Sequence, residues 1–420
     1  MHILLPTDVF PPRCGGAGWS AHALALALQA RGHNVSAIVP QQGREREETA
    51  PTLGVPTLRF GYGAPNIPFI KNYFRQERLW PRFADAIASA AVSGAPTVIH
   101  AQHTQAAAAG ALAKERVGAP LVVTVRDHWP WDYFATGLHG DRVPYARQDA
   151  ASLATDLMAR MGPLRGLAGL PAIPYMLGHL RRRQALLQRA DAVIAVSRYI
   201  AGRLGGIVAS ERIHIIPNIV DLAAIDATIA APSQVAIPSL PYLLFAGKLE
   251  RNKGAHLLPP IFAALGRERP ELLERVQIVF CDGGSLQPQL VSELAALGVR
   301  AAFLGGIAHD DVLRLMARAV ALVFPSLWGE PLSRLWLEAA ACGAAIIAMP
   351  TGGIADVVSD DVTGLIARGD AQFAAAIIRL VERPDVGLRL RRGARALAER
   401  RFATDAVAKI YDKLYVDLLY

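Results

Sequence analysis

The alternation of short apolar runs with helical patterns constrains the fold of this chain more than any other feature. In the first half, six runs are typical of strands: HILLPTD, NVSAIVP, TVIHA, PLVVTV, DAVIAVS and RIHIIPN. The second half starts the alternation again with YLLFAGK, VQIVFCD, AAFLGG, ALVFPS and AAIIAM. Strands separated by helices predict parallel sheets in an α/β fold. We expect the first helix at residues 21–31.

Length and composition indicate more than one domain, each with a large core. The chain has 420 residues, of which 52% are hydrophobic and 19% charged. That balance excludes a disordered chain, and the length exceeds what one core usually supports. Prolines cluster at residues 230–241 and predict a hinge. We therefore expect a Rossmann-like domain at residues 1–235, a second at 236–404, and a last helix at 405–420 that packs back on the first domain. The two domains should face each other across a cleft.

Two glutamates, Glu330 and Glu338, lie in the segment PSLWGEPLSRLWLEAAACG. Proline suits the first helical position and glycine the end of a helix, so we expect a helix that begins at Pro331 and ends before Gly343. The start of a helix is a natural anion site. Because Glu338 lies two turns further on, one ligand with a diphosphate and two polyols can meet both carboxylates. Two solvated glutamates remain the alternative, although Glu338 lies among small apolar residues.

Other loops with functional potential follow predicted strands. Open parallel sheets bind ligands beyond the carboxyl ends of their strands. Gly15 and Gly16 follow the first strand and precede a helix, where a phosphate or sugar can approach the backbone. Lys248 and Lys253 follow YLLFAGK, where two ammonium groups suit a diphosphate, although loop lysines are often only solvated. The tripeptide beginning at Gly283 follows VQIVFCD in the same way.

Several classes of protein are disfavoured by what the chain contains. No run of about 18 apolar residues indicates a membrane span, and the start resembles a strand more than a signal peptide. Cys14, Cys281 and Cys342 are odd in number and far apart, so we expect neither a disulfide framework nor a metal site, and a cytoplasmic protein. The segment at 16–21 matches G-x-G-x-x-A, but VFPPRC separates it from the strand and the second strand ends without an acid. A dehydrogenase is therefore a poor second interpretation.

The formal net charge of +8 is concentrated in two stretches. Residues 136–190 contain three aspartates (Asp141, Asp149 and Asp156) and eight arginines (Arg142, Arg147, Arg160, Arg165, Arg181, Arg182, Arg183 and Arg189). Residues 66–83 mix aromatic side chains with Lys and Arg. Such stretches suit an anionic membrane surface or a lipid-phosphate acceptor. Solvated helices are the open alternative, and nucleic acid is not expected because no recognition motif accompanies the charge.

Taken together, these blocks resemble glycosyltransferase family 4, the glycosyl transferases group 1, nearly from end to end. The blocks that carry the resemblance are FPPRCGGAGWSAHALALALQARGHNV, PTVIHAQHT, VVTVRDHWP, ADAVIAVSRYI, RIHIIPNIVD, FAGKLERNKG, VQIVFCDGG, FLGGIAHDDV and PSLWGEPLSRLWLEAAACGAAIIAMPTGGIADVV. The resemblance implies a GT-B fold and an enzyme that transfers a sugar, with retention and without a metal ion or cofactor, from a UDP- or GDP-sugar. The acceptor is expected to be a glycan or a lipid-linked molecule in polysaccharide or glycolipid synthesis, with possible association at the inner face of the membrane.

The resemblance also implies roles for individual residues. Glu338 would hold the ribose hydroxyls of the donor, and Glu330 with the amides after it would hold the donor sugar. The donor set is Gly15, Gly16, Lys248, Lys253, Gly283, Glu330, Pro331, Leu332, Ser333 and Glu338. The lysines would neutralise the diphosphate, and stabilising charge where it develops is how such a site accelerates transfer. His103, Arg126, Asp127 and His128 are the acceptor-side candidates, and we count Arg126 and Asp127 with Glu330, Lys248 and Lys253 as catalytic.

The chain departs from the family pattern at three of these positions. Lys248 stands where the family usually has arginine, Cys281 where it usually has a glycine, and Arg126 where many members have histidine. A GT-B epimerase or hydrolase and a non-catalytic protein that binds nucleotide sugars remain alternatives. Product analysis distinguishes the first from a transferase, and ligand binding without turnover identifies the second.

Overall fold

The computed structural model describes the chain except for residues 44–46, 68–69, 93, 141–142 and 145–147, and side chains are not described at 143–144. Its contacts divide the chain into two compact units. The first unit contains Met1–Ile219 and Thr404–Tyr420, and the second contains Val220–Ala403. The division falls at residue 220, and our prediction of a boundary at 235 is wrong.

The reason for the earlier boundary is the packing of residues 220–235. Helix α9 (Leu222–Ala230) contacts α13 (His309–Arg318) and α14 (Arg334–Ala341) of the second unit. The prolines that suggested a hinge follow α9, and there the backbone N–H of Gln234 donates to Asp311 Oδ1 at 3.0 Å. The proline-rich segment is therefore tied to the second unit.

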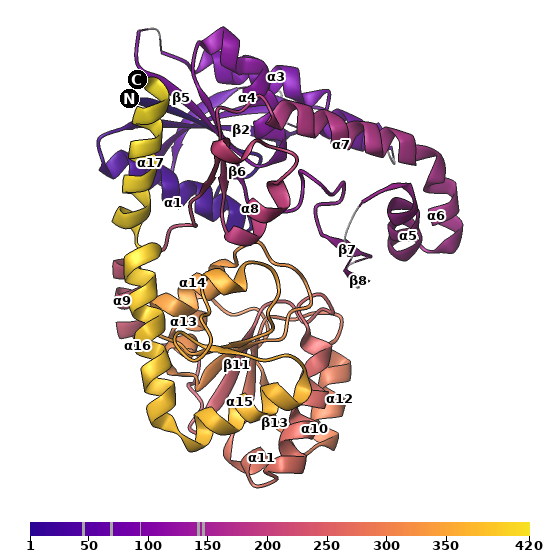
Figure 1. Ribbon diagram of the computed structural model, residues 1–420, viewed down its shortest axis with the longest axis vertical. Helices are drawn as coiled ribbons and strands as arrows, with labels where there is room; N and C mark the ends of the chain where they lie inside the picture. Colours follow the sequence, from indigo (N-terminus) through magenta and orange to yellow (C-terminus); the bar gives the residue numbers. More distant parts are fainter. Residues whose placement is uncertain (44–46, 68–69, 93, 141–142, 145–147) are drawn as a thin grey trace. The chain divides into compact units, whose positions relative to one another are not determined.

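The first unit is built on an eight-stranded sheet in the order β10-β9-β6-β5-β1-β2-β4-β3 (Figure 1). All neighbours pair in parallel except β3 and β4, which are antiparallel. The strands are β1 (His2–Pro6), β2 (Asn34–Gln42), β3 (Glu48–Thr52), β4 (Val55–Tyr62), β5 (Thr97–Gln102), β6 (Leu121–Val125), β9 (Ala192–Ala195) and β10 (Ile213–Ile215). The central strands β1, β5 and β6 are buried along their whole length, as expected for a sheet covered on both faces. All six strands predicted in this half are confirmed, whereas β3 and β4 were missed.

The helices of the first unit include α1 (Gly16–Ala30), α3 (Leu79–Ser89), α4 (Thr104–Val117) and α8 (Arg198–Leu204). The first helix therefore begins at Gly16, five residues before the predicted start. A helical arm, which we define as α5 (Ala150–Met161), α6 (Pro163–Gly169) and α7 (Ile173–Leu187), carries a small core of its own (Figure 1). That core consists of Leu153, Leu157, Ile173 and Met176. A short helix, α2 (Ile70–Arg75), and a hairpin of β7 (Leu138–His139) with β8 (Val143–Pro144) complete the unit.

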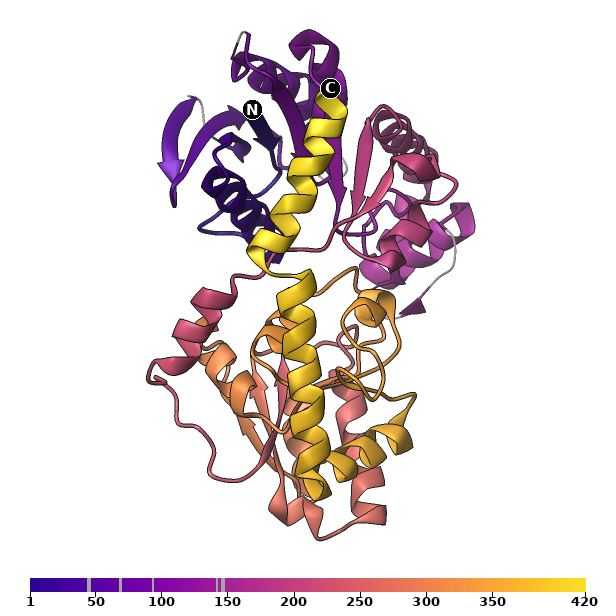
Figure 2. The same cartoon turned by 60° about the vertical axis from the view of Figure 1, so that its left-hand side comes forward.

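The last helix, α17 (Thr404–Leu419), returns to the first unit (Figure 2). Its Tyr415 is fully buried, and the Tyr415 hydroxyl lies 2.6 Å from His100 Nδ1 in β5. Arg31, at the end of α1, forms ion pairs with Asp405 and Asp412 on α17. Residues at the end of the chain thus complete the core of a unit that begins at residue 1.

The second unit is built on a six-stranded parallel sheet in the order β13-β12-β11-β14-β15-β16. Its strands are β11 (Tyr242–Ala246), β12 (Gln277–Cys281), β13 (Arg300–Phe303), β14 (Ala321–Phe324), β15 (Ile346–Ala348) and β16 (Leu365–Ile366). Its further helices are α10 (Leu258–Glu268), α11 (Leu272–Arg275), α12 (Gln287–Ala296), α15 (Asp370–Glu382) and α16 (Pro384–Arg401). All five strands predicted in this half are present, and only the short edge strand β16 was missed.

Candidate functional site

The helix that carries Glu338 begins later than its sequence predicts. Helix α14 starts at Arg334 with Ser333 in the N-cap position, and Glu330 to Leu332 form a loop before it. The prediction that the helix begins at Pro331 is therefore wrong. Proline also suits turns, and a loop after the strand is what carries Glu330 away from the helix axis. The predicted end is correct, since Gly343 takes the left-handed conformation with φ of 62° directly after the helix.

Glu330 forms an ion pair with Lys253 in the second unit. Lys253 Nζ donates to Glu330 Oε2 at 3.0 Å, and the same ammonium lies 4.7 Å from the centre of the Trp328 ring. Glu330 is only 9% exposed. The side chains come from the loops after β11 and β14, which are neighbouring strands of the sheet. The buried carboxylate of Glu330 is thus paired, at the carboxyl edge of the sheet, with an ammonium group that also makes a cation–π contact with Trp328.

Gly254 permits this contact. It has φ of 75°, and a Cβ atom at this position would lie 1.8 Å from the carbonyl oxygen of Pro325. The backbone of the loop that carries Lys253 therefore touches the backbone of the loop that carries Glu330. The Ser326 hydroxyl strengthens the junction by donating to the Asn252 carbonyl at 3.0 Å. Only glycine fits there, because other residues would meet backbone atoms that cannot move aside.

Gly352 supports Glu330 from the other side. It follows β15 with φ of 57°, and a Cβ atom there would lie 2.3 Å from the Glu330 carbonyl oxygen. The N–H of the next residue, Gly353, donates to that same oxygen at 2.8 Å. Loops after three successive strands of the sheet therefore fix the position of one glutamate.

Glu338 lies in the second turn of α14 and is 4% exposed. Its Oε1 atom is contacted by His309 Nε2 at 3.3 Å and by an Arg334 guanidinium nitrogen at 3.2 Å. The hydrogen bond to Glu338 raises the pKa of His309. Among the described residues, the contacts from His309 and Arg334 are both made to the same oxygen of the Glu338 carboxylate. Glu338 is therefore a buried acceptor whose charge is balanced by groups at the surface.

A pocket of about 360 Å³ in the second unit brings these parts together. Lys253, His309, Ser333 and Cys281 contribute to its lining. The pocket thus touches the ammonium that pairs with Glu330, the imidazole that pairs with Glu338, and the N-cap of α14. Burial raises the pKa of the Cys281 thiol to about 12, so it is neutral at ordinary pH and serves as an apolar wall.

The remaining donor-side candidates occupy nearby loops or the first unit. Lys248 is exposed after β11. Gly283 follows β12, and its carbonyl accepts from the Leu249 N–H at 3.0 Å, so the loops after β11 and β12 lie against each other. In the first unit, Gly15 is the N-cap of α1 and Gly16 its first residue, and both are exposed. The two glycines therefore place exposed backbone at the start of a helix.

The acceptor-side candidates lie at the carboxyl edge of the first sheet, after the adjacent strands β5 and β6. His103 follows β5 and is 7% exposed. Its backbone has φ of 78° and ψ of −175°, a combination that almost only glycine adopts, so the position is strained. Burial, and after it the nearby Arg126 charge, lowers the pKa of His103 to about 3, so the ring is neutral. Arg126 donates to Gln102 and to Asn218.

Asp127 and His128 differ in their surroundings. Burial raises the pKa of Asp127 to about 6, although its carboxylate accepts from the Trp129 N–H at 2.8 Å. His128 is 1% exposed, and its Nε2 lies 3.1 Å from the Tyr199 hydroxyl. Asp127 therefore sits at the sheet edge as a partly protonated carboxyl group near pH 6, whereas His128 packs inside the first unit.

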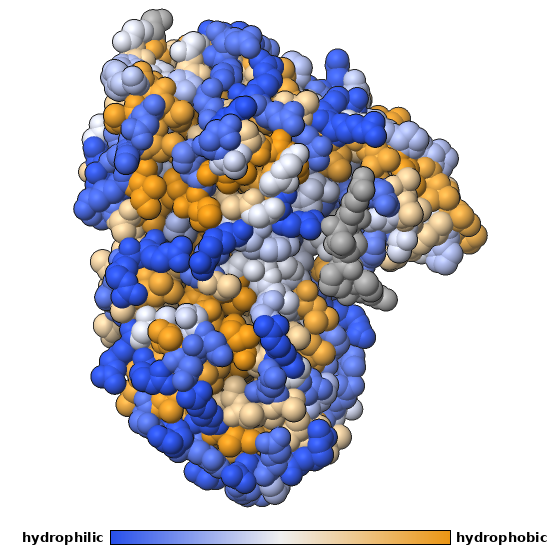
Figure 3. Space-filling view, in the orientation of Figure 1, coloured by the Kyte–Doolittle hydropathy of each residue, from blue (hydrophilic) through white to orange (hydrophobic). Residues whose placement is uncertain are grey.

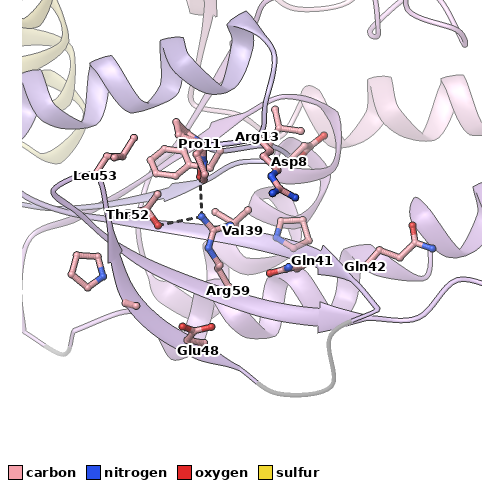
Figure 4. Close-up of a pocket in the computed structure, with 16 residues that line it drawn as sticks. Asp8, Pro11, Arg13, Val39, Gln41, Gln42, Glu48, Thr52, Leu53 and Arg59 are labelled. Carbon is pink, nitrogen blue, oxygen red and sulfur yellow. Dashed lines mark hydrogen bonds between the residues drawn. The ribbon is translucent and has the colours of Figure 1, made fainter.

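A second pocket, of about 680 Å³, lies in the first unit beside the loop after β1 (Figure 4). Asp8, Gln41 and Arg59 contribute polar groups to it. Arg59 donates to the Pro11 carbonyl at 3.0 Å and to Thr52 Oγ1 at 3.1 Å, which ties the loop to strands β3 and β4. None of the four acceptor-side candidates lines this pocket.

Sequence reasoning missed three residues of these sites. His309 follows β13, so the rule that loops after strands carry function applies to it. Arg334 stands four residues before Glu338, a spacing that places two helical side chains side by side. Asp8 follows β1 directly, and its carboxylate accepts from the Gln105 and Ala106 N–H groups at 2.9 and 2.8 Å, at the start of α4. Among the described residues, no group of three or more His, Cys, Asp or Glu side chains is arranged to hold a metal ion.

Two Rossmann-like units with polar loops at the carboxyl edges of their sheets define the GT-B class of proteins. Comparison with known families agrees: Glycosyltransferase Family 4 matches residues 14–224, and Glycosyl transferases group 1 matches residues 230–397. The chain belongs to glycosyltransferase family 4.

Curated relatives include glycosyltransferases, and a solved structure shares the fold. D-inositol 3-phosphate glycosyltransferase of Xylanimonas cellulosilytica is 30% identical over 74% of this chain and 69% of its own length. Alpha-maltose-1-phosphate synthase of Mycolicibacterium smegmatis is 31% identical over 47% of this chain and 56% of its own length. The chain thus spans about half to two thirds of these relatives. Anabaena HepE in complex with UDP aligns over the whole of both chains with a TM-score of 0.68 and 19% identity, a similarity of fold.

Proposed function

We propose that this protein transfers a sugar from a UDP-sugar to a hydroxyl group of a glycan or lipid-linked acceptor. The observation that carries the proposal is the pocket of the second unit, which Lys253 and His309 line while they contact Glu330 and Glu338. Cations beside a helix start suit a diphosphate, and buried carboxylates suit sugar and ribose hydroxyls. HepE, a structural relative, is known in complexes with UDP and with UDP-glucose, which favours UDP over GDP as the carrier.

The contacts support the following roles. Lys253 would hold the diphosphate and stabilise the negative charge that develops on it as it leaves. Glu330, fixed by the loops around it, would accept hydrogen bonds from the transferred sugar. Glu338 would accept from the ribose hydroxyls. Lys248 and Gly283 lie in loops that adjoin the site, and we place them on the donor side as well.

We extend the proposal to the stereochemistry of the reaction. The acceptor oxygen forms its bond to the anomeric carbon on the face from which the diphosphate departs, and the leaving phosphate takes the acceptor proton. Configuration is then retained, and neither a metal ion nor another cofactor is required. His103, Arg126 and Asp127 would face the acceptor. NMR of the new glycosidic bond tests retention, and full activity in the presence of a chelator tests the absence of a metal requirement.

The first experiment is a thermal-shift panel with UDP, GDP, ADP and NAD on wild type, Glu338→Gln and Glu268→Ala. A ligand at about a hundred times its dissociation constant stabilises by roughly 2.7 kcal/mol, which raises the melting temperature by a few degrees. We expect a shift with UDP in wild type and in Glu268→Ala, an exposed glutamate at the end of α10. The shift should disappear in Glu338→Gln.

Other results would change the conclusion in defined ways. A shift with GDP alone would identify GDP, and not UDP, as the nucleotide that carries the sugar. It would leave the assignment of the site residues intact. A UDP shift of equal size in Glu338→Gln would remove the ribose assignment. A UDP shift with no product from any UDP-sugar and a panel of acceptors would favour a non-catalytic binding protein, and a shift with NAD alone would favour a dehydrogenase.

A further inference from the structure

The helical arm of the first unit contains an apolar pocket that the proposed donor site does not use. Its volume is about 550 Å³, and it lies between α2, α5 and α7 and the loop after β6. The side chains that define it are Ile70, Tyr133, Phe134, Leu157, Tyr175 and Met176. Four of these are aliphatic or phenylalanine side chains, so the pocket suits an apolar ligand segment.

Arginine side chains stack on the aromatic walls of this pocket. The guanidinium of Arg160 lies 4.8 Å from the ring centre of Phe134, that of Arg183 lies 5.5 Å from Tyr133, and that of Arg182 lies 5.8 Å from Tyr175. Lys71 also lines the pocket. Within residues 150–187 there are five arginines and one aspartate. Arg160 also pairs with Asp156 and Arg182 with Glu77, and cations still outnumber carboxylates beside the pocket. An apolar cavity with cations beside it is complementary to a molecule with an apolar chain and an anionic head.

The Tyr175 hydroxyl adds a polar group to the pocket wall. It is buried and has no hydrogen-bond partner among the described residues. A buried hydroxyl without a partner is costly, and a ligand oxygen can supply the missing bond. Tyr175 therefore gives the pocket one donor for a head group beside its apolar walls.

Exposed apolar side chains continue from the pocket over the arm. Those near the pocket in sequence are Ile67 (52% exposed), Ile70 (46%), Tyr73 (40%), Met161 (37%), Leu164 (84%) and Leu167 (55%). Figure 3 shows hydrophobic surface over the end of the arm, where α6 lies in Figure 1. No helix among the described residues is long and apolar enough to cross a bilayer. Exposed apolar groups beside basic ones are typical of segments that lie in a membrane interface.

We propose that this pocket binds the aliphatic chain of an anionic lipid acceptor, with its phosphate held by Lys71, the arginines and Tyr175. The inference rests on the proposed transferase function, which it deepens by naming a lipid phosphate as the acceptor class. An acceptor anchored by its chain and its phosphate in the arm would keep the hydroxyl groups of its head free to receive the sugar. The surrounding apolar side chains would meet the bilayer in which that lipid resides.

Binding of alkyl phosphates to the full chain tests the inference without any need for turnover. Isothermal titration calorimetry would compare dodecyl phosphate, butyl phosphate, dodecanol and inorganic phosphate, with dodecyl phosphate below its critical micelle concentration and dodecanol below its solubility limit. Dodecyl phosphate can bury more methylene groups in the pocket than butyl phosphate, and each buried methylene favours binding, so we expect it to bind at least 30-fold more tightly. Dodecanol should bind at least tenfold more weakly than dodecyl phosphate, because it lacks the anion.

Matched substitutions locate the binding. Ile70→Asp places a charge in the pocket wall, whereas Ile410→Asp places one on α17 at a side chain of the same type and the same 46% exposure. Both positions are exposed, so both variants should fold. We expect dodecyl phosphate affinity to fall at least tenfold in Ile70→Asp and to stay within twofold of wild type in Ile410→Asp.

The outcomes that overturn the inference are distinct. Equal affinities in the two variants, or equal affinities for dodecyl phosphate and dodecanol, would exclude a lipid-phosphate site here. A wild-type dimer that becomes a monomer in Ile70→Asp, without dodecyl phosphate binding, would identify the arm as a contact between copies of the chain. UDP binding in the same samples separates the two proposals: a protein that binds UDP but no alkyl phosphate refutes only the lipid site, and the reverse result refutes only the donor site.

Discussion

At the scale of single residues, the candidate donor site depends on a close approach between two backbones. Lys253 reaches Glu330 because Gly254, the residue after it, allows the loop after β11 to touch the loop after β14. The sequence identifies Lys253 and Glu330 as candidates, since both follow apolar strands. It cannot show that they pair, because 77 positions separate them and their contact depends on the order of the strands in the sheet.

Gly254→Ala tests how much the site depends on this approach. Gly298→Ala is the matched control, since Gly298 has φ of 72° and open space where Cβ would lie. Both variants carry the cost of a left-handed alanine, but only the first forces a Cβ atom against Pro325. We expect Gly254→Ala to be less stable than Gly298→Ala by about 1–3 kcal/mol in urea unfolding. Its response to UDP should also be lost, and equal behaviour of the two variants would contradict this account.

His103 shows what residue patterns leave hidden. Its position after a strand marks it as a candidate, yet its strained backbone and its neutral ring are visible only in the structure. The same holds for Cys281, which sequence comparison marks as a departure from the family pattern. The structure gives it a physical description, a neutral thiol in the wall of the pocket.

At the scale of elements, the contact between α13 and α14 makes the environment of Glu338 depend on whether His309 is protonated. His309 is the first residue of α13 and faces Glu338 on α14. The helix around Glu338 was predicted from proline and glycine, and its end was correct. Its start was wrong because proline favours both a helix start and a turn, and local sequence does not decide between them.

The sign of the resulting pH dependence follows from the raised pKa of His309. Its contribution to stability is fully present below the unfolded pKa of about 6.5 and is lost as pH rises through the higher folded pKa. We therefore expect wild type to exceed His309→Gln in urea midpoint most at pH 6 and least at pH 8. The effect should be small because the side chain is 60% exposed. In a Glu338→Gln background the pH dependence of this difference should vanish, and a difference that grows with pH would refute the assignment.

At the scale of the whole molecule, strand and helix alternation was enough to predict two α/β domains and eleven of their strands. The strands missed in the two main sheets lie at an edge or next to one: β3 is an edge strand of the first sheet, β4 is its neighbour, and β16 is an edge strand of the second. The two-residue strands β7 and β8, which pair outside these sheets, were missed as well. Edge strands are less buried and carry weaker apolar patterns, so sequence reasoning overlooks them. The boundary between the units was misplaced because prolines indicate a break between domains. They do not indicate with which unit the residues on either side of the break will pack.

The buried contact between α17 and β5 gives a prediction at this scale. Tyr415→Phe would leave His100 Nδ1 without its partner in the core of the first unit. We expect a loss of about 1–3 kcal/mol in unfolding free energy, the cost of an unsatisfied buried polar group. Tyr420→Phe is the control, since Tyr420 is 90% exposed. Removal of its hydroxyl group should change the unfolding free energy by less than about 0.5 kcal/mol. A Tyr415→Phe variant as stable as wild type would show that the hydrogen bond contributes nothing.

The return of α17 to the first unit sets an order of events during synthesis. Residues 220–403 form the second unit, and they leave the ribosome before the residues of α17 that the first unit needs. The second unit can therefore finish folding while the first still exposes the apolar face that α17 will cover. Domains usually fold in the order in which they are made, but in this chain the unit that is started first is completed last.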